Sequence, residues 1–380
     1  MKILLIFGAF DPPRKQHIAM VSAARERLKA DEVIIFPVEA ESENGFPVGR
    51  EHAEKMIRAA FADEKCAVSQ FADGNLFDCI VAAAERFADK KTPEISVFVF
   101  SDVLSRLKRN GNCDNKICDA LKDAATEGKI LTFSGVKPPI SAQTKVFTTV
   151  FSCAEDVKEQ IKNVPSTFIK AEAALGIFDK CLPKRVAEYA AENGVYKTPY
   201  SDFLIESLKE SRKLHTAGVV SLALTYAQRL KVSLADAYTA AILHDCAKYL
   251  VAADWGYETP EGVPEPVVHQ FLGAYIAENV LDVKNKDVLN AIRYHTTGRK
   301  NMSQLEKIVF LADLLERGRT YEEADALRAA VDKDFESGFV RCVDRMYKYL
   351  LSGGGEVYYL TKECRDYYVA QSKNTIKRNQ

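Results

Sequence analysis

The spacing of apolar residues changes near the middle of this 380-residue chain. In the first half, β-branched and aromatic runs alternate with helical segments, whereas beyond Tyr200 apolar residues recur three and four positions apart. The first pattern predicts a parallel sheet covered by helices, and the second predicts amphipathic helices. The sequence therefore predicts two domains, an α/β doubly wound parallel sheet followed by an all-α domain.

The boundary between the two predicted domains falls in the segment Gly194–Tyr200, GVYKTPY, which contains turn residues and a proline. We therefore predict domains at residues 1–197 and 201–370. The predicted strands of the first domain are Ile3–Gly8, Glu32–Val38, Ile95–Ser101 and Lys129–Val136.

Composition and charge exclude several classes of protein. A net charge near −1 provides no electrostatic reason to expect a nucleic acid or an acidic membrane as partner. The apolar stretches are too short and interrupted for a transmembrane helix, and the start, MKILLIFGAFDPP, is more typical of a strand than of a signal peptide. The nine cysteines follow no disulfide framework. These features predict a cytoplasmic protein with reduced thiols, and they leave its oligomeric state open.

Four of the six histidines lie in the second half and are interleaved with aspartates. The pair His244-Asp245 stands out because it interrupts an apolar helical run, AAILHDCAKYL, where unpaired polar groups would be costly to bury. Neutral imidazoles and carboxylates are common ligands of zinc, iron and manganese. We therefore predict a metal site whose ligands come from five helices: His215, His244, Asp245, His269, His295 and Asp313.

This set of residues resembles that of the HD superfamily of metal-dependent phosphohydrolases. Three segments resemble more narrowly the bacterial HD-domain diadenosine tetraphosphate hydrolases: LHDCAK at 243–248, HQFLGA at 269–274, and Ala291–Arg319. The resemblance covers nearly the whole second half, with Arg317 in place of the proline in that family's E-P-G-R motif. Cyclic-dinucleotide phosphodiesterases usually carry Gly-Tyr-Pro after the His-Asp pair, which this chain lacks.

The resemblance implies symmetrical cleavage of diadenosine tetraphosphate into two ADP at a di-iron centre. His215, His244, Asp245 and Asp313 would hold one ion, and His269 and His295 a second, with Asp245 as a bridge. Sites of this kind also accept manganese, zinc or cobalt. Asp245 and Lys248, three residues apart and thus on one helix face, are the predicted catalytic residues. The predicted substrate-binding residues are Thr296, Thr297, Arg299 and Arg319.

The first domain resembles the nicotinate mononucleotide adenylyltransferases at its two ends. The segment 7–17, FGAFDPPRKQH, resembles their G-G-x-F-D-P-x-H-x-G-H motif, and 166–170, STFIK, resembles S-T-x-I-R; Leu182–Tyr196 resembles their closing helix. Arg14 and Gln16 replace the first histidine and the glycine of the first motif, and Lys170 replaces the arginine of the second. We therefore predict a degenerate nucleotide site formed by Gly8, Phe10, His17, Ser166, Thr167 and Lys170.

The predicted function is thus metal-dependent hydrolysis of a dinucleoside polyphosphate. Two alternatives stay open from the sequence. In the first, the N-terminal domain also adenylates nicotinate or nicotinamide mononucleotide. In the second, the helical domain binds the alarmone as a sensor without hydrolysing it.

Overall fold

The computed structural model of this chain describes residues 1–38, 48–71, 86, 94–99, 129–134, 145–150, 164–178, 181–354 and 356–378. These residues form two compact units. The first contains the described residues up to 166 together with 178 and 181–195. The second contains residues 167–177 and the described residues from 196 onward.

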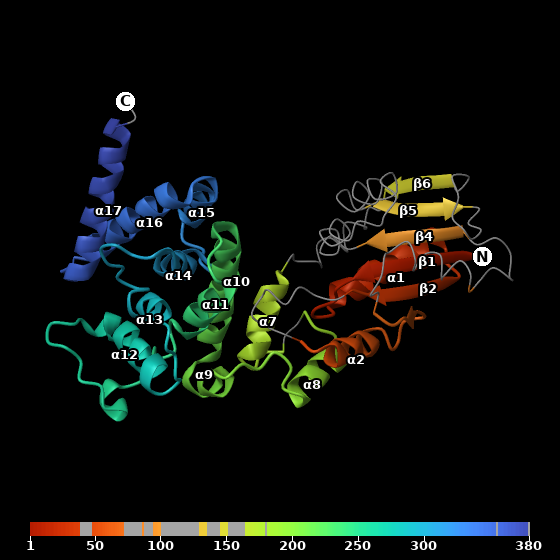
Figure 1. Cartoon of the computed structure of the whole chain (residues 1–380), viewed down its shortest axis with the longest axis horizontal. Helices are drawn as coiled ribbons and strands as arrows, with labels where there is room; N and C mark the ends of the chain where they lie inside the picture. Colours follow the sequence, from red (N-terminus) through yellow and green to blue (C-terminus); the bar gives the residue numbers. More distant parts are fainter. Residues whose placement is uncertain are drawn as a thin grey trace. The chain divides into compact units, whose positions relative to one another are not determined.

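A six-stranded sheet forms the centre of the first unit (Figure 1). Its spatial order is β3-β2-β1-β4-β5-β6. The four strands β1 to β4 run parallel, which confirms the predicted parallel sheet, and β1 is buried from Ile3 to Phe7 because it lies between two parallel neighbours. The strands are β1 (Lys2–Gly8), β2 (Glu32–Pro37), β3 (Ala67–Val68), β4 (Glu94–Val99), β5 (Lys129–Ser134) and β6 (Lys145–Val150).

The last two strands depart from the all-parallel prediction. β5 lies within the predicted strand at 129–136 but runs antiparallel to β4, and β6 runs antiparallel to β5 (Figure 1). Only ten residues separate Ser134 from Lys145, which is too few for the crossover that parallel strands require. Antiparallel edge strands on a mainly parallel sheet are common.

The described helices of the first unit are α1 (Lys15–Leu28), α2 (Arg50–Ala60) and α8 (Lys184–Glu192). α1 follows β1 directly and packs against it, and α2 packs against α8. A hydrogen bond of 2.8 Å between His52 Nδ1 and the Tyr189 hydroxyl joins α2 to α8. α8 lies within the closing segment Leu182–Tyr196 that the sequence singled out.

All the described secondary-structure elements of the second unit are helices, as predicted. It includes α7, so that helix packs with the helical unit although it precedes α8 in the chain. The predicted first domain, residues 1–197, therefore includes residues 167–177, whereas the first compact unit does not. The helices of the second unit are α7 (Ser166–Ala174, of which Ser166 belongs to the first unit), α9 (Ser201–Ser207), α10 (Glu210–Leu230), α11 (Leu234–Leu243), the short η3 (Ala252–Trp255), α12 (Glu265–Asn279), α13 (Lys286–Arg293), α14 (Gln304–Leu315), α15 (Ala324–Lys333), α16 (Phe335–Ser352) and α17 (Tyr359–Arg378).

Packing among α10 to α14 brings distant parts of the sequence together. α10 packs against α11 and α14, and α13 packs against α12 and α14. Capping side chains fix where α11, α13 and α14 begin, because the oxygens of Ser233, Asn285 and Ser303 accept hydrogen bonds from backbone N–H groups in the first turns. None of the helices in the described part of the chain combines the length and the apolar character that a membrane span requires.

Candidate metal centre

Each predicted metal ligand lies on, or directly after, one of five packed helices. His215 is in the second turn of α10, His269 lies in α12, and Asp313 lies in α14. His244 and Asp245 follow the last residue of α11, and His295 lies two residues beyond the end of α13. The helical packing therefore gathers six ligand-type residues that span 99 positions of sequence into one centre.

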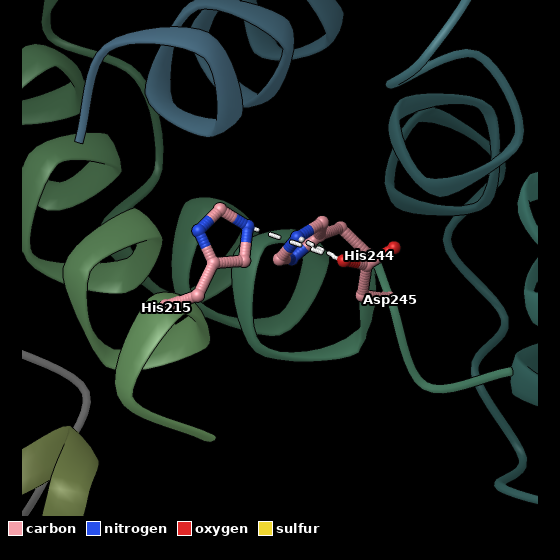
Figure 2. A group of neighbouring side chains, drawn as sticks. All are labelled: His215, His244 and Asp245. Carbon is pink, nitrogen blue, oxygen red and sulfur yellow. Dashed lines mark ion pairs between the residues drawn. The ribbon is translucent and has the colours of Figure 1, made fainter. Parts of the chain in front are cut away.

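Two groups of three ligand-type residues share Asp245. His215, His244 and Asp245 form the first group, and Figure 2 shows their side chains pointing toward one another. His215 Nε2 lies 4.0 Å and His244 Nε2 3.4 Å from Asp245 Oδ2. His215 Nε2 is also 3.0 Å from Asp313 Oδ1. Asp313 therefore adds a fourth ligand-type side chain to the first group.

His269 and His295 form the second group with the other oxygen of Asp245. Their Nε2 atoms lie 3.2 and 3.5 Å from Asp245 Oδ1, and 3.3 Å from each other. The two oxygens of one carboxylate thus face different pairs of histidines. This arrangement is what a carboxylate that bridges two ions requires.

Backbone carbonyls orient two of these imidazole rings. His244 Nδ1 lies 2.7 Å from the Ala241 carbonyl oxygen, and His295 Nδ1 lies 2.8 Å from that of Ile292. A carbonyl can only accept, so Nδ1 of each ring carries the proton and donates it. The lone pair is then left on Nε2, the atom of each ring that faces Asp245.

Three buried atoms in this centre have no hydrogen-bond partner among the described residues: His215 Nε2, His244 Nε2 and Asp245 Oδ1. Buried polar atoms without partners are costly, and metal ions would satisfy all three. Metal bonds of about 2.0–2.2 Å to nitrogen and oxygen place neighbouring ligand atoms roughly 3 to 4 Å apart, the range of the separations given above. The residues therefore fit divalent metal ions, and they form a metal-binding cluster.

The protonation states also suit metal binding. Burial lowers the pKa of His244, and it lowers that of His269 to about 4. Burial would raise the pKa of Asp245, but the adjacent histidines, His244 foremost, hold it well below its usual value. Burial would likewise lower the pKa of His215, but the neighbouring carboxylates of Asp313 and Glu316 raise it. Neutral His244 and His269 and ionised Asp245 are the forms that coordinate metals.

Glu316 orients His215, and the sequence reasoning missed it. His215 Nδ1 lies 3.2 Å from Glu316 Oε1, and the buried carboxylate also accepts a 2.5 Å hydrogen bond from the backbone N–H of Gly318. A Cβ added at Gly218 of α10 would collide with this carboxylate, so the glycine provides room for it. The E-R-G-R stretch at 316–319 contains the signal, since its glutamate lies three residues after Asp313, at the C-cap of α14.

Arg212 is a second residue that the sequence reasoning missed. Its Nη1 donates a 2.8 Å hydrogen bond to Asp245 Oδ2 from one turn before His215 on α10. The guanidinium is partly buried, with 23% of its side chain exposed. The spacing of three residues between Arg212 and His215 places both on one helix face, which is the pattern that could have identified it.

Lys248 reaches the second group of ligands, but not from a helix as the sequence predicted. α11 ends at Leu243, and a 2.9 Å bond from the Lys248 N–H to the Asp245 carbonyl belongs to a series of tight turns after it. Lys248 Nζ lies 3.2 Å from His269 Nε2. The tight turns thus bring this cation to the metal centre even though the helix has ended.

The predicted substrate-binding threonines lie beside the same ligands. The Thr296 hydroxyl is 2.9 Å from His295 Nε2 and 3.2 Å from His269 Nε2. Thr297 is fully buried, and its N–H and that of Thr296 both donate to the side-chain oxygen of Gln270. Gln270 therefore fixes the Thr296-Thr297 turn against α12.

The two predicted substrate-binding arginines occupy different surroundings. Arg319 donates from Nη2 to Asp313 Oδ1 at 2.7 Å, with 38% of its side chain exposed. Arg299 instead donates two hydrogen bonds, of 2.8 and 2.6 Å, to the buried carboxylate of Glu306, and its guanidinium lies 4.8 Å from the centre of the Tyr294 ring. The Arg299 guanidinium is thus paired with Glu306, whereas the Arg319 guanidinium lies next to a metal ligand.

A cavity of about 630 Å³ opens beside the metal centre. Its polar lining residues include Thr296, Asp313 and Arg319. Its other walls are largely apolar and aromatic, with Val267, Tyr321, Met346, Tyr349, Leu350 and Tyr358 among the lining residues. A cavity of this size and character suits a small organic ligand with a charged end.

The predicted nucleotide-binding residues of the N-terminal region divide between the two units. Gly8, Phe10 and His17 lie where β1 leads into α1, and Arg14 donates from its backbone N–H to His17 Nδ1 at 3.1 Å and from Nη1 to the Val164 carbonyl at 2.7 Å. Thr167 and Lys170 lie on α7 in the second unit, where the Thr167 hydroxyl is 2.8 Å from that of Ser221 and Lys170 is buried. Ser166, the first residue of α7, belongs to the first unit. The six residues therefore do not gather within one unit.

Comparisons with known proteins match this description. The HD domain family model matches residues 212–318. The symmetrical bis(5'-nucleosyl)-tetraphosphatase of Bacillus subtilis is 30% identical over 161 residues, which are 40% of this chain and 87% of that protein. A Mycoplasma pneumoniae protein named probable nicotinate-nucleotide adenylyltransferase/Ap4A hydrolase is 27% identical over 333 residues, 84% of this chain and 90% of that one. A crystal structure of a predicted HD superfamily hydrolase involved in NAD metabolism, from Clostridium acetobutylicum, is 35% identical and covers 45% of this chain and 95% of its own, with a TM-score of 0.42.

Proposed function

This chain belongs to the HD-domain symmetrical bis(5'-nucleosyl)-tetraphosphatases, and from that membership we propose that its helical unit hydrolyses diadenosine tetraphosphate to two ADP. The observation that carries the proposal is the pair of ligand groups that share Asp245, next to a cavity that Asp313 and Thr296 line. Such a pair suits in-line displacement at phosphorus, and the aromatic walls suit the nucleoside.

The chain's own residues supply binding, orientation and charge. His215, His244, Asp245 and Asp313 would hold one divalent ion, and Asp245, His269 and His295 a second. When bound, such ions polarise a phosphoryl oxygen and lower the pKa of water toward about 7. Lys248 and Arg319 place positive charge beside the two groups, where they would stabilise charge that develops on the phosphate.

The Thr296-Thr297 turn would orient the phosphate chain. Gln270 holds this turn through two backbone N–H groups, so the Thr296 hydroxyl has a defined position beside His269 and His295. A preoriented donor loses little entropy when substrate binds, which favours the reactive geometry. We propose iron as the metal, a choice supported by the resemblance to the di-iron members of this family; the donor set also accepts manganese, zinc or cobalt.

The first test is anaerobic incubation of iron- or manganese-loaded full-length protein with diadenosine tetraphosphate, followed by chromatography of the nucleotides. The proposal predicts two ADP from the parent and no turnover from the His244→Ala/Asp245→Ala variant. ATP plus AMP would contradict symmetrical cleavage. Tight binding without turnover by metal-replete protein would favour the alarmone sensor instead. Metal analysis of protein purified without added metal tests the choice of iron.

A second candidate function has one specific observation in its favour. The Mycoplasma pneumoniae relative, matched over 84% of this chain, has a name that includes nicotinate-nucleotide adenylyltransferase. Adenylyl transfer would require phosphate binding at the start of α1, where Arg14 bonds to Val164 and lies against His17. Incubation with ATP and nicotinate or nicotinamide mononucleotide tests this activity. Dinucleotide formed by the parent would show that the site is active. Dinucleotide formed only by an Arg14→His variant would show that this substitution restores the site.

A further inference from the structure

Two described arginines contact carboxylates of the metal centre, but only one of the two lines the cavity. Arg319 donates to Asp313 at 2.7 Å and lines the cavity. Arg212 donates to Asp245 Oδ2 at 2.8 Å, and it is not among the described residues that line the cavity. The centre therefore has a cation next to Asp245 that a ligand confined to the cavity would not use.

Arg212 belongs to a small cluster of cations around an aromatic ring. The ring is that of Tyr249, which is 40% exposed and lies at the end of the turns that follow Asp245. Lys209 Nζ, from the N-cap residue of α10, lies 4.4 Å from the centre of this ring. Arg212 contacts both Asp245 and Tyr249, so its guanidinium joins the metal ligand to this ring.

The chemistry of this cluster matches one nucleotide. Arginine and lysine bind phosphate oxygens, with arginine able to donate two parallel hydrogen bonds. An exposed tyrosine ring offers a face on which a base can stack. Arg212 contacts the metal ligand Asp245, and Tyr249, with Lys209 beside it, contacts Arg212. A phosphate-binding cation at the metal centre followed by an aromatic ring is the order of groups from the centre of a dinucleoside polyphosphate to its end.

We propose that Lys209, Arg212 and Tyr249 form a second nucleotide subsite, which binds the nucleoside diphosphate half of the substrate that lies outside the cavity. This inference rests on the proposed function. With one half in the cavity near Arg319 and the other half at Arg212, the metal centre lies at the middle of the tetraphosphate. Cleavage between the second and third phosphates, with one ADP left in each subsite, then follows from the arrangement.

Tyr249 is the residue whose substitution tests the subsite most directly. The full-length, metal-loaded protein is compared as parent, Tyr249→Ala and Tyr249→Phe, with Lys213→Ala as a control for loss of a neighbouring α10 cation. The measurements are the KM for diadenosine tetraphosphate, the inhibition constant of adenosine 5'-tetraphosphate, which has one nucleoside, and the metal content of each protein. Loss of a stacked base commonly weakens binding by about 1–3 kcal/mol, roughly 5- to 150-fold.

The subsite predicts that Tyr249→Ala raises the KM at least about fivefold while the inhibition constant of adenosine 5'-tetraphosphate rises much less. Tyr249→Phe keeps the ring and stays within about threefold of the parent, and the metal content does not change. Equal effects on the two nucleotides, or an unchanged KM for the alanine variant, would overturn the proposal.

A second measurement separates this inference from the proposed function. ADP is titrated calorimetrically into the metal-loaded parent and into Tyr249→Ala. Two ADP sites in the parent, one of which binds ADP at least about fivefold more weakly in the variant, support the subsite even if the parent fails to cleave diadenosine tetraphosphate. A single ADP site in the parent, or equal affinities in both proteins, would overturn the subsite, whatever the hydrolysis assay shows.

Discussion

Replacing Glu316 by glutamine should weaken metal binding although Glu316 is not itself among the predicted ligands. The carboxylate faces His215 Nδ1 at 3.2 Å with one oxygen and accepts from the Gly318 N–H at 2.5 Å with the other. Glutamine is nearly isosteric but has one acceptor oxygen and one NH₂ group. The glutamine NH₂ group must face either His215 Nδ1 or the Gly318 N–H, so one of these two donors loses its acceptor.

The expected size of the effect follows from the bond that is lost. A hydrogen bond to a charged group contributes about 1.5–3 kcal/mol. At about 1.4 kcal/mol per tenfold change, this corresponds to a metal affinity roughly 10- to 100-fold weaker. Loss of a partner that orients a metal-ligating histidine generally has effects of about that size.

The assay is competition for Mn²⁺ between the full-length protein and a chelating indicator, under anaerobic conditions. Glu336→Gln serves as a matched control, since Glu336 is exposed on α16 and pairs with Lys307 at 2.7 Å. The control should bind Mn²⁺ like the parent. A Glu316→Gln protein with the parent's melting temperature and an affinity within about twofold of the parent's would refute the role of Glu316 in orienting His215.

Three further predictions concern space, protons and metal. Gly218→Ala should weaken Mn²⁺ binding at least about tenfold, because the added carbon would collide with the Glu316 carboxylate. The control Gly273→Ala should bind Mn²⁺ like the parent, because its added carbon would lie 3.4 Å from its nearest neighbour. Equal Mn²⁺ affinities for the two variants would contradict this prediction. Burial, and then the charge of Arg14, lower the pKa of His17 to about 3 from an ordinary value of 6.5, so the unfolded chain takes up a proton first as pH falls. The free energy of unfolding of the first unit should therefore be highest above pH 6.5 and fall by about 2 kcal/mol between pH 7 and pH 5; calorimetry should show a smaller fall for His17→Asn, and an equal fall would exclude His17 as its cause. Removal of metal by a chelator should lower the melting temperature of the helical unit, because metal ions stabilise only the folded centre. At a free metal concentration a thousandfold above Kd this stabilisation is about 4 kcal/mol. A chelator effect of the same size in His244→Ala/Asp245→Ala would place the stabilising metal elsewhere.

The fold class followed from local patterns, and its exceptions came from longer-range pairing. The strand signals at β1, β2 and β4 and the helical spacing of the second half correspond to observed elements because side-chain periodicity reports the local backbone. Strand direction is not encoded in periodicity. The antiparallel runs of β5 and β6 therefore could not be deduced from the apolar pattern of Lys129–Val136.

For the metal centre, the residue types were readable from the sequence, whereas their partners were not. His244 and Asp245 were conspicuous because polar side chains in an apolar run need compensation. Arg299 and Arg319 looked alike in sequence, yet Arg299 pairs with buried Glu306, seven residues away, and Arg319 with Asp313. The choice between such partners depends on distances of a few ångströms that the packing of helices decides.

Taken by itself, the sequence determined the chemical inventory of this protein: a mainly parallel sheet, a helical half, and six ligand-type side chains whose burial calls for metal ions. Tertiary structure alone decided that the two oxygens of Asp245 face different histidine pairs, that Glu316 and Gly218 set the orientation of His215, and that α7 packs with the helical unit. The physical reason is range. Periodicity and composition record how each residue relates to its neighbours along the chain. Coordination and ion pairing in the metal centre instead join atoms far apart in the sequence, such as those of His215 and Glu316, 101 positions apart, and only the packed helices bring such atoms within contact.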